Sequence, residues 1–247
     1  MNARFLSLLI GGVGLSTIIA IGYVNLIAEP IAPQNPEILT HQELIEQAQK
    51  IAVRIRTEKT SGSGIIIDKT NYTYTIITNR HVVARGDKYH IQTPDNNIHI
   101  GTLIVVSQQE DLAILQFTSD FIYETATINY EPLPLGISLF AAGFPFNSER
   151  LQVTSGKLSL QAIKPLKKGY QIGYTNTIYQ GMSGGAILNS VGEVVGVNGR
   201  SASPIIPDYQ YQDTTYPSEK LQQQMRQLSW GIPIVKAIEL SSTIENN

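Results

Sequence analysis

The chain has 247 residues, a formal net charge of −2 and no cysteine. The lack of cysteine excludes disulfides, thiolate metal sites and cysteine catalysis. The balanced charge, with no long basic patch, argues against a nucleic-acid partner. Hydrophobic residues make up 42% of the chain and charged residues only 15%, so the sequence predicts a folded protein with a substantial core.

The N-terminal segment 5–28 has no charged side chain, and Arg4 precedes it. Roughly 24 residues form about 36 Å of helix, enough to cross a bilayer core of about 30 Å. Because this run is longer than the core of a typical signal peptide, we expect a retained membrane anchor, with a cleaved signal peptide as the alternative. Arg4 favours a cytoplasmic N-terminus, with everything after residue 28 exported. Residues 29–42, which contain prolines, are expected to form an extended linker.

Residues 43–247 are expected to fold as one domain rich in short strands. Thr40 and Glu43 have the spacing of a capping box, which predicts a short helix through about Lys50. Helices are also expected near 217–227, with Ser218 as N-cap, and at 235–242. Many short β-branched and aromatic runs separated by turn residues predict an all-β barrel or sandwich. The predicted strands are 52–56, 65–68, 72–78, 89–92, 98–100, 103–106, 111–117, 138–143, 152–159, 170–175, 194–197 and 228–234.

Residues 181–185 read Gly-Met-Ser-Gly-Gly and place Ser183 between glycines. A serine hydroxyl is a weak nucleophile, so a catalytic serine needs a base beside it and backbone donors facing it. Glycines allow a turn tight enough for successive N–H groups to point into one space. A glycine-rich hairpin turn is the other interpretation, and this stretch alone does not decide between them.

All four histidines, His41, His81, His90 and His99, precede Ser183. This order excludes the α/β-hydrolase fold, in which the histidine follows the serine. His81 is the favoured base because it ends a β-rich run and can be held at the end of a sheet. His41 lies in a predicted helix cap, and His90 and His99 are expected to face solvent.

Asp111 is the favoured acid because it begins a strongly apolar strand, which draws it partly inside the protein. A carboxylate removed from water needs a partner, and the N–H of a catalytic histidine is such a partner. Asp68, Asp87, Asp95 and Asp120 lie in turn-like contexts and are expected to be solvated.

Three segments in order resemble the signature blocks of trypsin-like serine proteases, nearest to the bacterial HtrA/Deg type. They are Thr-Asn-Arg-His-Val-Val at 78–83, Asp-Leu-Ala-Ile-Leu at 111–115 and Gly-Met-Ser-Gly-Gly-Ala at 181–186. Residues 61–65 resemble the block that opens the first barrel of that family, and Ser-Trp-Gly at 229–231 resembles its substrate-binding strand. The resemblance implies two antiparallel six-stranded β-barrels, at about 50–130 and 131–240, with the active site between them.

The resemblance also implies residue roles. Ser183 would be the nucleophile, His81 the base and Asp111 the acid that orients His81. The backbone N–H groups of Gly181 and Ser183 would form the oxyanion hole. Ser229 and Gly231 would pair with the substrate, and Trp230 would wall the cleft. Thr177, six residues before Ser183, would floor the specificity pocket. Since Thr177 is neutral and small, small or medium aliphatic substrate residues are expected instead of Arg or Lys. No cofactor or metal is implied.

Two departures from the family are informative. Pancreatic-type members have Asp before the nucleophile, where it pairs with a new N-terminal ammonium after zymogen cleavage. Met182 cannot form that pair, so we expect no such switch. The HtrA type usually carries a peptide-binding PDZ domain after the protease, and this sequence ends within a few residues of the expected barrel. We therefore expect regulation and substrate capture without one.

The sequence predicts a serine endopeptidase that acts on polypeptides, exported and held on the extracytoplasmic side of a membrane by residues 5–28. Protein quality control is one role that the resemblance suggests. Signal cleavage would instead leave a soluble extracytoplasmic enzyme. A protease-like chaperone that binds peptides without cutting them, and a processing protease with one substrate, are the alternatives. An oligomer is possible, but no sequence feature identifies it.

Overall fold

The computed structural model of the chain describes residues 37–202 and 209–245. The predicted membrane segment 5–28 and most of the predicted linker lie outside these residues. Among the residues that are described, no helix is both long enough and apolar enough to span a membrane.

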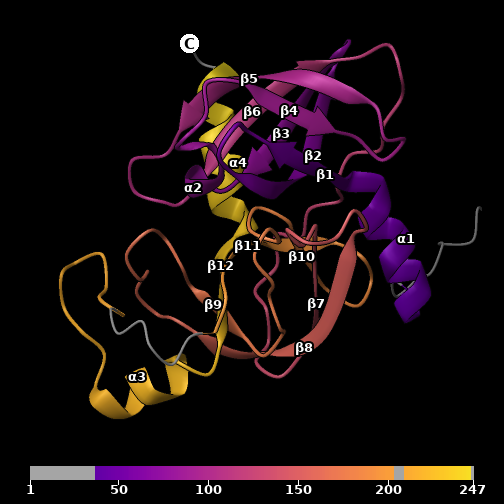
Figure 1. Cartoon of the computed structure of the whole chain (residues 1–247). Helices are drawn as coiled ribbons and strands as arrows, with labels where there is room; N and C mark the ends of the chain where they lie inside the picture. Colours follow the sequence, from indigo (N-terminus) through magenta and orange to yellow (C-terminus); the bar gives the residue numbers. More distant parts are fainter. Residues whose placement is uncertain (1–36, 203–208, 246–247) are drawn as a thin grey trace, which may run out of the picture. The chain divides into compact units, whose positions relative to one another are not determined.

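The first barrel is built from the strands shown in purple and magenta in Figure 1. Its strands are β1 (Ala52–Arg56), β2 (Ser61–Thr70), β3 (Thr73–Thr78), β4 (Tyr89–Gln92), β5 (Ile98–Val106) and β6 (Ala113–Thr118). They are hydrogen-bonded in the order β1-β2-β3-β6-β5-β4, and the antiparallel pairing of β4 with β1 closes the barrel.

The second barrel follows the first in the chain. Its strands are β7 (Ser138–Gly143), β8 (Gln152–Gln161), β9 (Ile172–Tyr174), β10 (Ala186–Leu188), β11 (Val194–Arg200) and β12 (Ser229–Pro233). They are paired in the order β10-β11-β12-β9-β8-β7, and β7 pairs with β10 to close the barrel. The prediction of two closed, antiparallel, six-stranded barrels is confirmed.

Two strands differ from the sequence prediction. It missed β10, and it placed two separate strands at 98–100 and 103–106. The structure has a single continuous strand, β5, because Gly101 pairs with Tyr89 across the ladder. A Cβ at Gly101 would lie 2.5 Å from Cδ1 of Ile91. The glycine therefore permits close packing inside a strand and does not make a turn.

Four helices flank the barrels in the described part of the chain: α1 (His41–Ile51), α2 (Arg80–Val83), α3 (Glu219–Met225) and α4 (Ile234–Glu245). The predicted capping box is present, since Glu43 N–H donates to the Thr40 hydroxyl and the Thr40 N–H donates to the Glu43 carboxylate. Ser218 caps α3 as predicted. Because α1 begins at His41, the last two residues of the predicted linker are helical.

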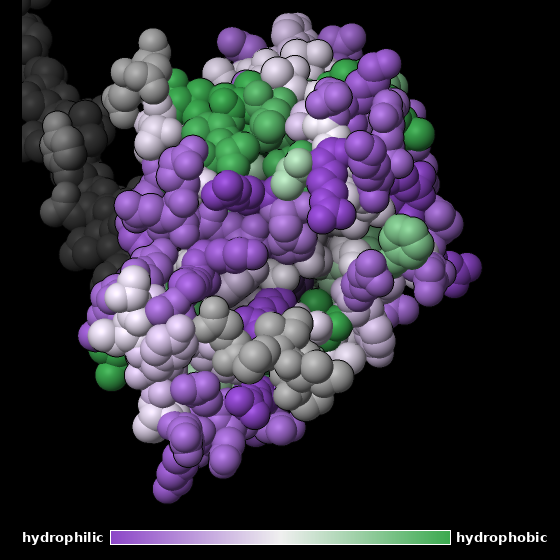
Figure 2. All heavy atoms as spheres, turned by 60° about the vertical axis from the view of Figure 1, so that its left-hand side comes forward, coloured by the Kyte–Doolittle hydropathy of each residue, from purple (hydrophilic) through white to green (hydrophobic). Residues whose placement is uncertain are grey.

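The apolar side chains gather in three clusters. One fills the first barrel and includes Ile55, Ile76 and Leu115. Another fills the second barrel and includes Leu139 and Tyr174. The third draws side chains from α1, α4 and both barrels into one core. Figure 2 shows a mostly hydrophilic face with one prominent apolar cluster. The shared core fixes the two barrels together, so residues at their facing edges are held in register.

Candidate active site

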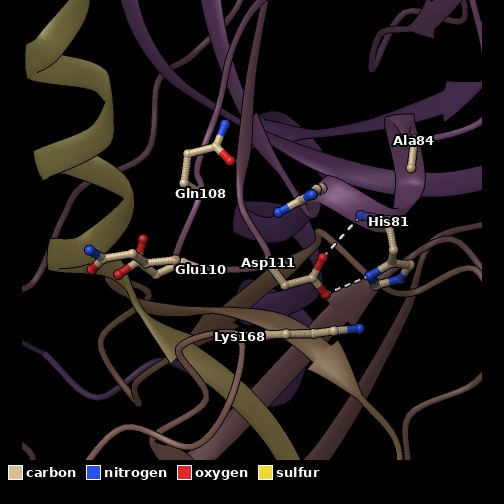
Figure 3. A pocket seen from close by; sticks show the side chains of 8 residues that line it. His81, Ala84, Gln108, Glu110, Asp111 and Lys168 are labelled. Carbon is tan, nitrogen blue, oxygen red and sulfur yellow. Dashed lines mark hydrogen bonds and ion pairs between the residues drawn. The ribbon is translucent and has the colours of Figure 1, made fainter. Parts of the chain in front are cut away.

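His81 and Asp111 come from neighbouring segments of the first barrel. His81 lies in α2 directly after β3, and Asp111 precedes β6, the partner of β3. Nδ1 of His81 lies 2.6 Å from Oδ2 of Asp111, and the His81 backbone N–H donates to Oδ1 at 3.0 Å (Figure 3). The amide of Asn79 donates to the Asp111 carbonyl oxygen at 2.9 Å. Three bonds thus join the two segments and bring the predicted pair together.

The Asp111 carboxylate is almost fully buried, with 3% of its side chain exposed. Burial raises its pKa, but the hydrogen bonds and charge of His81 and the hydroxyl of Tyr170 lower it, and the resulting pKa is below the ordinary value. An ionised carboxylate can only accept hydrogen bonds, so Nδ1 of His81 carries the donated proton. In the neutral imidazole, Nε2 is then the proton acceptor. The His81 side chain is 45% exposed, so the ring can meet a ligand.

The segment 181–185 turns at two glycines with left-handed backbone. Gly181 has a φ of +99° and Gly184 a φ of +85°. A Cβ at Gly181 would lie 2.6 Å from the Phe144 carbonyl oxygen, and one at Gly184 would overlap the Ser63 carbonyl oxygen. Only glycine suits either position, since a side chain would meet both backbone strain and a clash.

The backbone N–H groups of this segment divide into two sets. Those of residues 182, 184 and 185 donate to backbone carbonyl oxygens at 2.8–3.1 Å. Those of Gly181 and Ser183 have no acceptor in residues 37–202 and 209–245. The two donors without a partner are the two that the sequence predicted for an oxyanion hole.

Ser63, on β2 of the first barrel, holds this segment from the other side. Its backbone N–H donates to the carbonyl oxygen of Ser183 at 2.8 Å. Its hydroxyl donates to the carbonyl oxygen of Gly181 at 2.9 Å and accepts the N–H of Phe144 at 2.8 Å. The fully buried Ser63 therefore binds the carbonyls of both residues whose N–H groups lack acceptors.

The Ser183 hydroxyl donates to the carbonyl oxygen of Gly199 at 3.3 Å. Within the described part of the chain it has no hydrogen bond to His81. The two residues nevertheless belong to one region, because a Cβ at Gly62 would meet both Val82, the neighbour of His81, and the Ser183 carbonyl oxygen. The structure thus bonds His81 to Asp111 and places Ser183 beside them with its hydroxyl turned toward Gly199.

The predicted roles of Ser229, Trp230 and Gly231 are wrong. These residues lie on β12, which pairs with β9 on one side and β11 on the other. Both edges of the strand are therefore used inside the barrel and cannot add a substrate. Trp230 is fully buried, its indole N–H donates to the Met225 carbonyl oxygen, and its ring packs on Tyr209. It is a core residue and walls no cleft.

The strand edge that does reach Ser183 belongs to β11. Its pairing with β10 ends at Val197, and Asn198 bonds with its N–H to Gly185 and with its carbonyl to Gly184. After that point no described strand pairs with this edge, and Gly199 presents its carbonyl oxygen to Ser183. The end of β11 is thus the edge beside the candidate nucleophile.

The predicted role of Thr177 as the floor of the specificity pocket is also wrong. It is exposed, whereas Asn176 and Ile178 on either side are buried. The amide of Asn176 donates to the carbonyl oxygens of Leu139 and Thr154 at 2.9 and 2.7 Å. These bonds hold the segment against the barrel with Thr177 outside, so it does not floor a recessed pocket, and the expected aliphatic specificity loses its basis.

The other histidines lie apart from the site. His41 and His90 are exposed. His99 is half-buried, contrary to prediction, because its Nε2 lies 3.0 Å from the Tyr123 hydroxyl and its ring packs on Phe117. These contacts hold His99 against Tyr123 and Phe117. Of the four histidines, His81 is the one whose segment lies next to Ser183.

A cavity of about 320 Å³ lies beside the His81–Asp111 pair (Figure 3). Its lining also includes Arg80, Ala84, Gln108, Gln109, Glu110 and Lys168. The Glu110 carboxylate accepts a hydrogen bond from the Ser107 hydroxyl. In Figure 3 the Lys168 side chain runs alongside Asp111 toward His81. Of the residues that the structure describes, no three His, Asp or Glu side chains are grouped to hold a metal.

The loop at 144–149 contacts the segment of Ser183 and is tied to the first barrel. The Phe146 N–H donates to the Gln180 carbonyl oxygen at 2.7 Å, next to Gly181. Arg54, with 3% of its side chain exposed, donates to the Glu149 carboxylate at 3.0 Å and to the Ser148 carbonyl oxygen. Burial lowers the pKa of Arg54, while the Glu149 charge raises it. Sequence analysis did not identify this ion pair, because its partners lie 95 residues apart.

Two closed six-stranded barrels, an exposed histidine bonded to a buried aspartate, and a glycine-flanked serine define the class of trypsin-like peptidases. The trypsin-like peptidase domain family matches residues 62–197, over half of the chain. The chain belongs to this family.

Relatives of the Deg and HtrA type confirm the resemblance found in the sequence. Serine endoprotease DegS of Escherichia coli K12 is 31% identical over 144 residues, which cover 57% of this chain and 39% of DegS. A probable periplasmic DegP-like serine endoprotease of Hahella chejuensis is 33% identical over 143 residues, covering 57% and 29%. The chain thus spans well under half the length of the curated relatives it matches.

A solved structure supports the fold independently. The crystal structure of a serine endoprotease from Yersinia pestis superposes with a TM-score of 0.65, covering 85% of this chain and 68% of that chain. At 21% identity, this likeness shows the shared fold alone.

Proposed function

We propose that this chain is a serine endopeptidase that cleaves peptide bonds with His81, Asp111 and Ser183. The observation that carries the proposal is the hydrogen bonding of segment 181–185. Its N–H groups are satisfied at 182, 184 and 185 but lack acceptors at Gly181 and Ser183. Backbone donors in a folded segment are mostly paired, so two donors without an acceptor, on the half-buried serine itself and two residues before it, support a site built for an incoming oxygen atom.

The chemistry follows from the protonation states. Rotation of the Ser183 side chain would exchange its bond to Gly199 for one to Nε2 of His81. His81 takes the hydroxyl proton as Oγ attacks the carbonyl carbon, and Asp111 stabilises the imidazolium that forms. The imidazolium then gives the proton to the departing amine, and water, activated by His81 in the same way, releases the acyl group from Ser183.

The two free N–H groups would bind the carbonyl oxygen as it becomes an anion. A single donor of this kind contributes about 3 kcal/mol in well-studied enzymes. The edge of β11 at Gly199 would hold an extended peptide by strand addition. This assignment replaces β12, whose two edges are already paired.

The test is the turnover of an unfolded protein such as casein by the native chain and by Ser183→Ala. The native chain should release peptides, and Ser183→Ala should lose at least about 99% of that activity. Circular dichroism of both chains should show the same fold. If the native chain binds casein but does not cut it, the endopeptidase proposal fails and the chaperone alternative is supported.

We also propose that the protein is exported and anchored by residues 5–28, with the barrels on the extracytoplasmic side. The uncharged run after Arg4 supports this, and relatives named periplasmic are consistent with an exported enzyme. The full chain should stay with membranes through washes at high salt and at alkaline pH. A chain lacking residues 1–36 should be soluble and active. A mature N-terminus near Glu29 would instead show a cleaved signal peptide.

A further inference from the structure

Tyr170 is a buried tyrosine of the second barrel whose hydroxyl reaches an acid of the first. It lies just before β9 with 6% of its surface exposed. Its hydroxyl donates to Oδ2 of Asp111 at 2.6 Å, the same oxygen that binds Nδ1 of His81. The oxygen that orients the imidazole therefore has a second donor from across the barrel interface.

The turn before Tyr170 makes two further contacts with the same segment. The Asp111 N–H donates to the Lys168 carbonyl oxygen at 2.8 Å. Gly169 packs on Glu110, since a Cβ there would lie 2.6 Å from the Glu110 Cγ. Lys168 adopts a φ of +68°, in the left-handed region where a residue with a side chain is strained. A strained backbone held by contacts on both sides indicates that the turn is kept in one position.

The ring of Tyr170 also lies against the residue that faces the nucleophile. A Cβ at Gly199 would overlap Cε1 of the ring. Gly199 is the residue whose carbonyl oxygen accepts the Ser183 hydroxyl. One side chain thus contacts the acid at its hydroxyl end and the strand beside the serine at its ring.

We propose that Tyr170 is a positioning residue, which holds the Asp111 carboxylate for His81 and sets the end of β11 beside Ser183. It touches neither the substrate nor the reacting atoms and acts through Asp111 and Gly199. This inference rests on the proposed function, because the positioning matters for activity only if His81 and Ser183 are catalytic.

The protonation of Asp111 gives the inference a pH signature. Burial raises the pKa of Asp111, the contacts of His81 lower it, and the Tyr170 hydroxyl lowers it further. Without that hydroxyl Asp111 holds its proton to a higher pH, and a protonated acid cannot stabilise the imidazolium. The charged and titratable groups around Asp111 are His81, Tyr170, and the cavity residues Arg80, Glu110 and Lys168. Burial raises the pKa of Tyr170, and the charge of Arg200 in turn lowers it.

The experiment uses Tyr170→Phe, which removes one oxygen atom and keeps the ring against Gly199. Tyr74→Phe is the matched control, since Tyr74 is fully buried and its hydroxyl donates to the Phe121 carbonyl oxygen at 2.8 Å in the first barrel. The dependence of kcat/KM on pH is measured for the native chain and both variants. In addition, the Nδ1 proton signal of His81 is followed by NMR in a Ser183→Ala background, where no turnover is needed.

Tyr170→Phe should lower kcat by about tenfold or more with little change in KM, because a lost bond to a charged group weakens an interaction needed in the transition state. The acidic limb of the pH profile should move to higher pH, and the Nδ1 proton signal should shift. Tyr74→Phe should change neither. An unmoved pH profile together with an unmoved Nδ1 signal would overturn the inference. A native chain without peptidase activity would refute the proposed function, and the NMR comparison would still decide the role of Tyr170.

Discussion

The hydroxyl of Ser63 donates a hydrogen bond of 2.9 Å to the carbonyl oxygen of Gly181, across the interface of the two barrels. The Gly181 carbonyl shares one planar peptide unit with the Met182 N–H, and this unit lies between the two peptide units that carry the free N–H groups of Gly181 and Ser183. Ser63 also binds the Ser183 carbonyl through its backbone N–H. The first barrel thus helps to direct the free N–H groups of the second.

Ser63→Ala should therefore lower kcat by more than the variant's loss of stability explains. The change leaves the Gly181 carbonyl and the Phe144 N–H without a side-chain partner, at a cost of about 1–3 kcal/mol in unfolding free energy. We expect kcat to fall by at least about tenfold. Ser119→Ala is the control, since the buried Ser119 hydroxyl also accepts a backbone N–H, from Phe121 at 3.0 Å. Equal loss of kcat in the two variants would contradict the assigned role.

Substitutions on β11 and β12 should separate the two candidate substrate strands. Gly199→Ala should remove most activity, because its Cβ would collide with the buried ring of Tyr170. Overpacking of this kind costs about 1–3 kcal/mol. Ser229→Ala removes a bond of 2.7 Å from the Ser229 hydroxyl to the Asn176 carbonyl oxygen, inside the barrel. It should lower the melting temperature and leave KM unchanged. A raised KM in Ser229→Ala would restore β12 as the substrate strand.

Glu149→Gln should loosen the loop beside Gly181. Arg54 would keep the Ser148 carbonyl but lose its charged partner, and bonds to charged groups contribute about 1.5–3 kcal/mol. Because the Glu149 side chain is 76% exposed, we expect the lower end of that range in unfolding free energy, with a parallel drop in kcat. Glu239→Gln breaks an exposed pair with Lys236 and should cost less than about 0.5 kcal/mol. Similar losses from both substitutions would show that Arg54 does not depend on Glu149.

Asp111→Asn should change how stability depends on pH. The pKa of Asp111 is lowered from 3.8 in the folded chain, so its ionised form favours folding. That contribution is present above pH 3.8 and is lost as the pH falls through the lowered value. The difference in unfolding free energy between native and variant chains should therefore shrink as the pH falls below 3.8. Urea unfolding across this range measures it, and a difference that does not vary with pH would contradict the assignment.

Local patterns in the sequence were sufficient for most of the strands, the capping box at Thr40 and Glu43, and the choice of His81, Asp111 and Ser183 as candidates, but they missed β10 and divided β5. A strand's alternation, a cap and a glycine turn depend on residues within a few positions of one another. The resemblance to trypsin-like proteases then supplied the arrangement in two barrels, which the pairing of the strands confirms.

Tertiary structure alone decided which strand edge lies beside Ser183. The Ser-Trp-Gly sequence on β12 has the pattern of a substrate strand, but the register of β9 and β11 uses both its edges and buries Trp230. The contacts that hold the site also join distant residues: Ser63 and Gly181 are 118 positions apart, and Tyr170 and Asp111 are 59 apart. No local pattern encodes such pairs, because they form only when two separately closed barrels pack against each other.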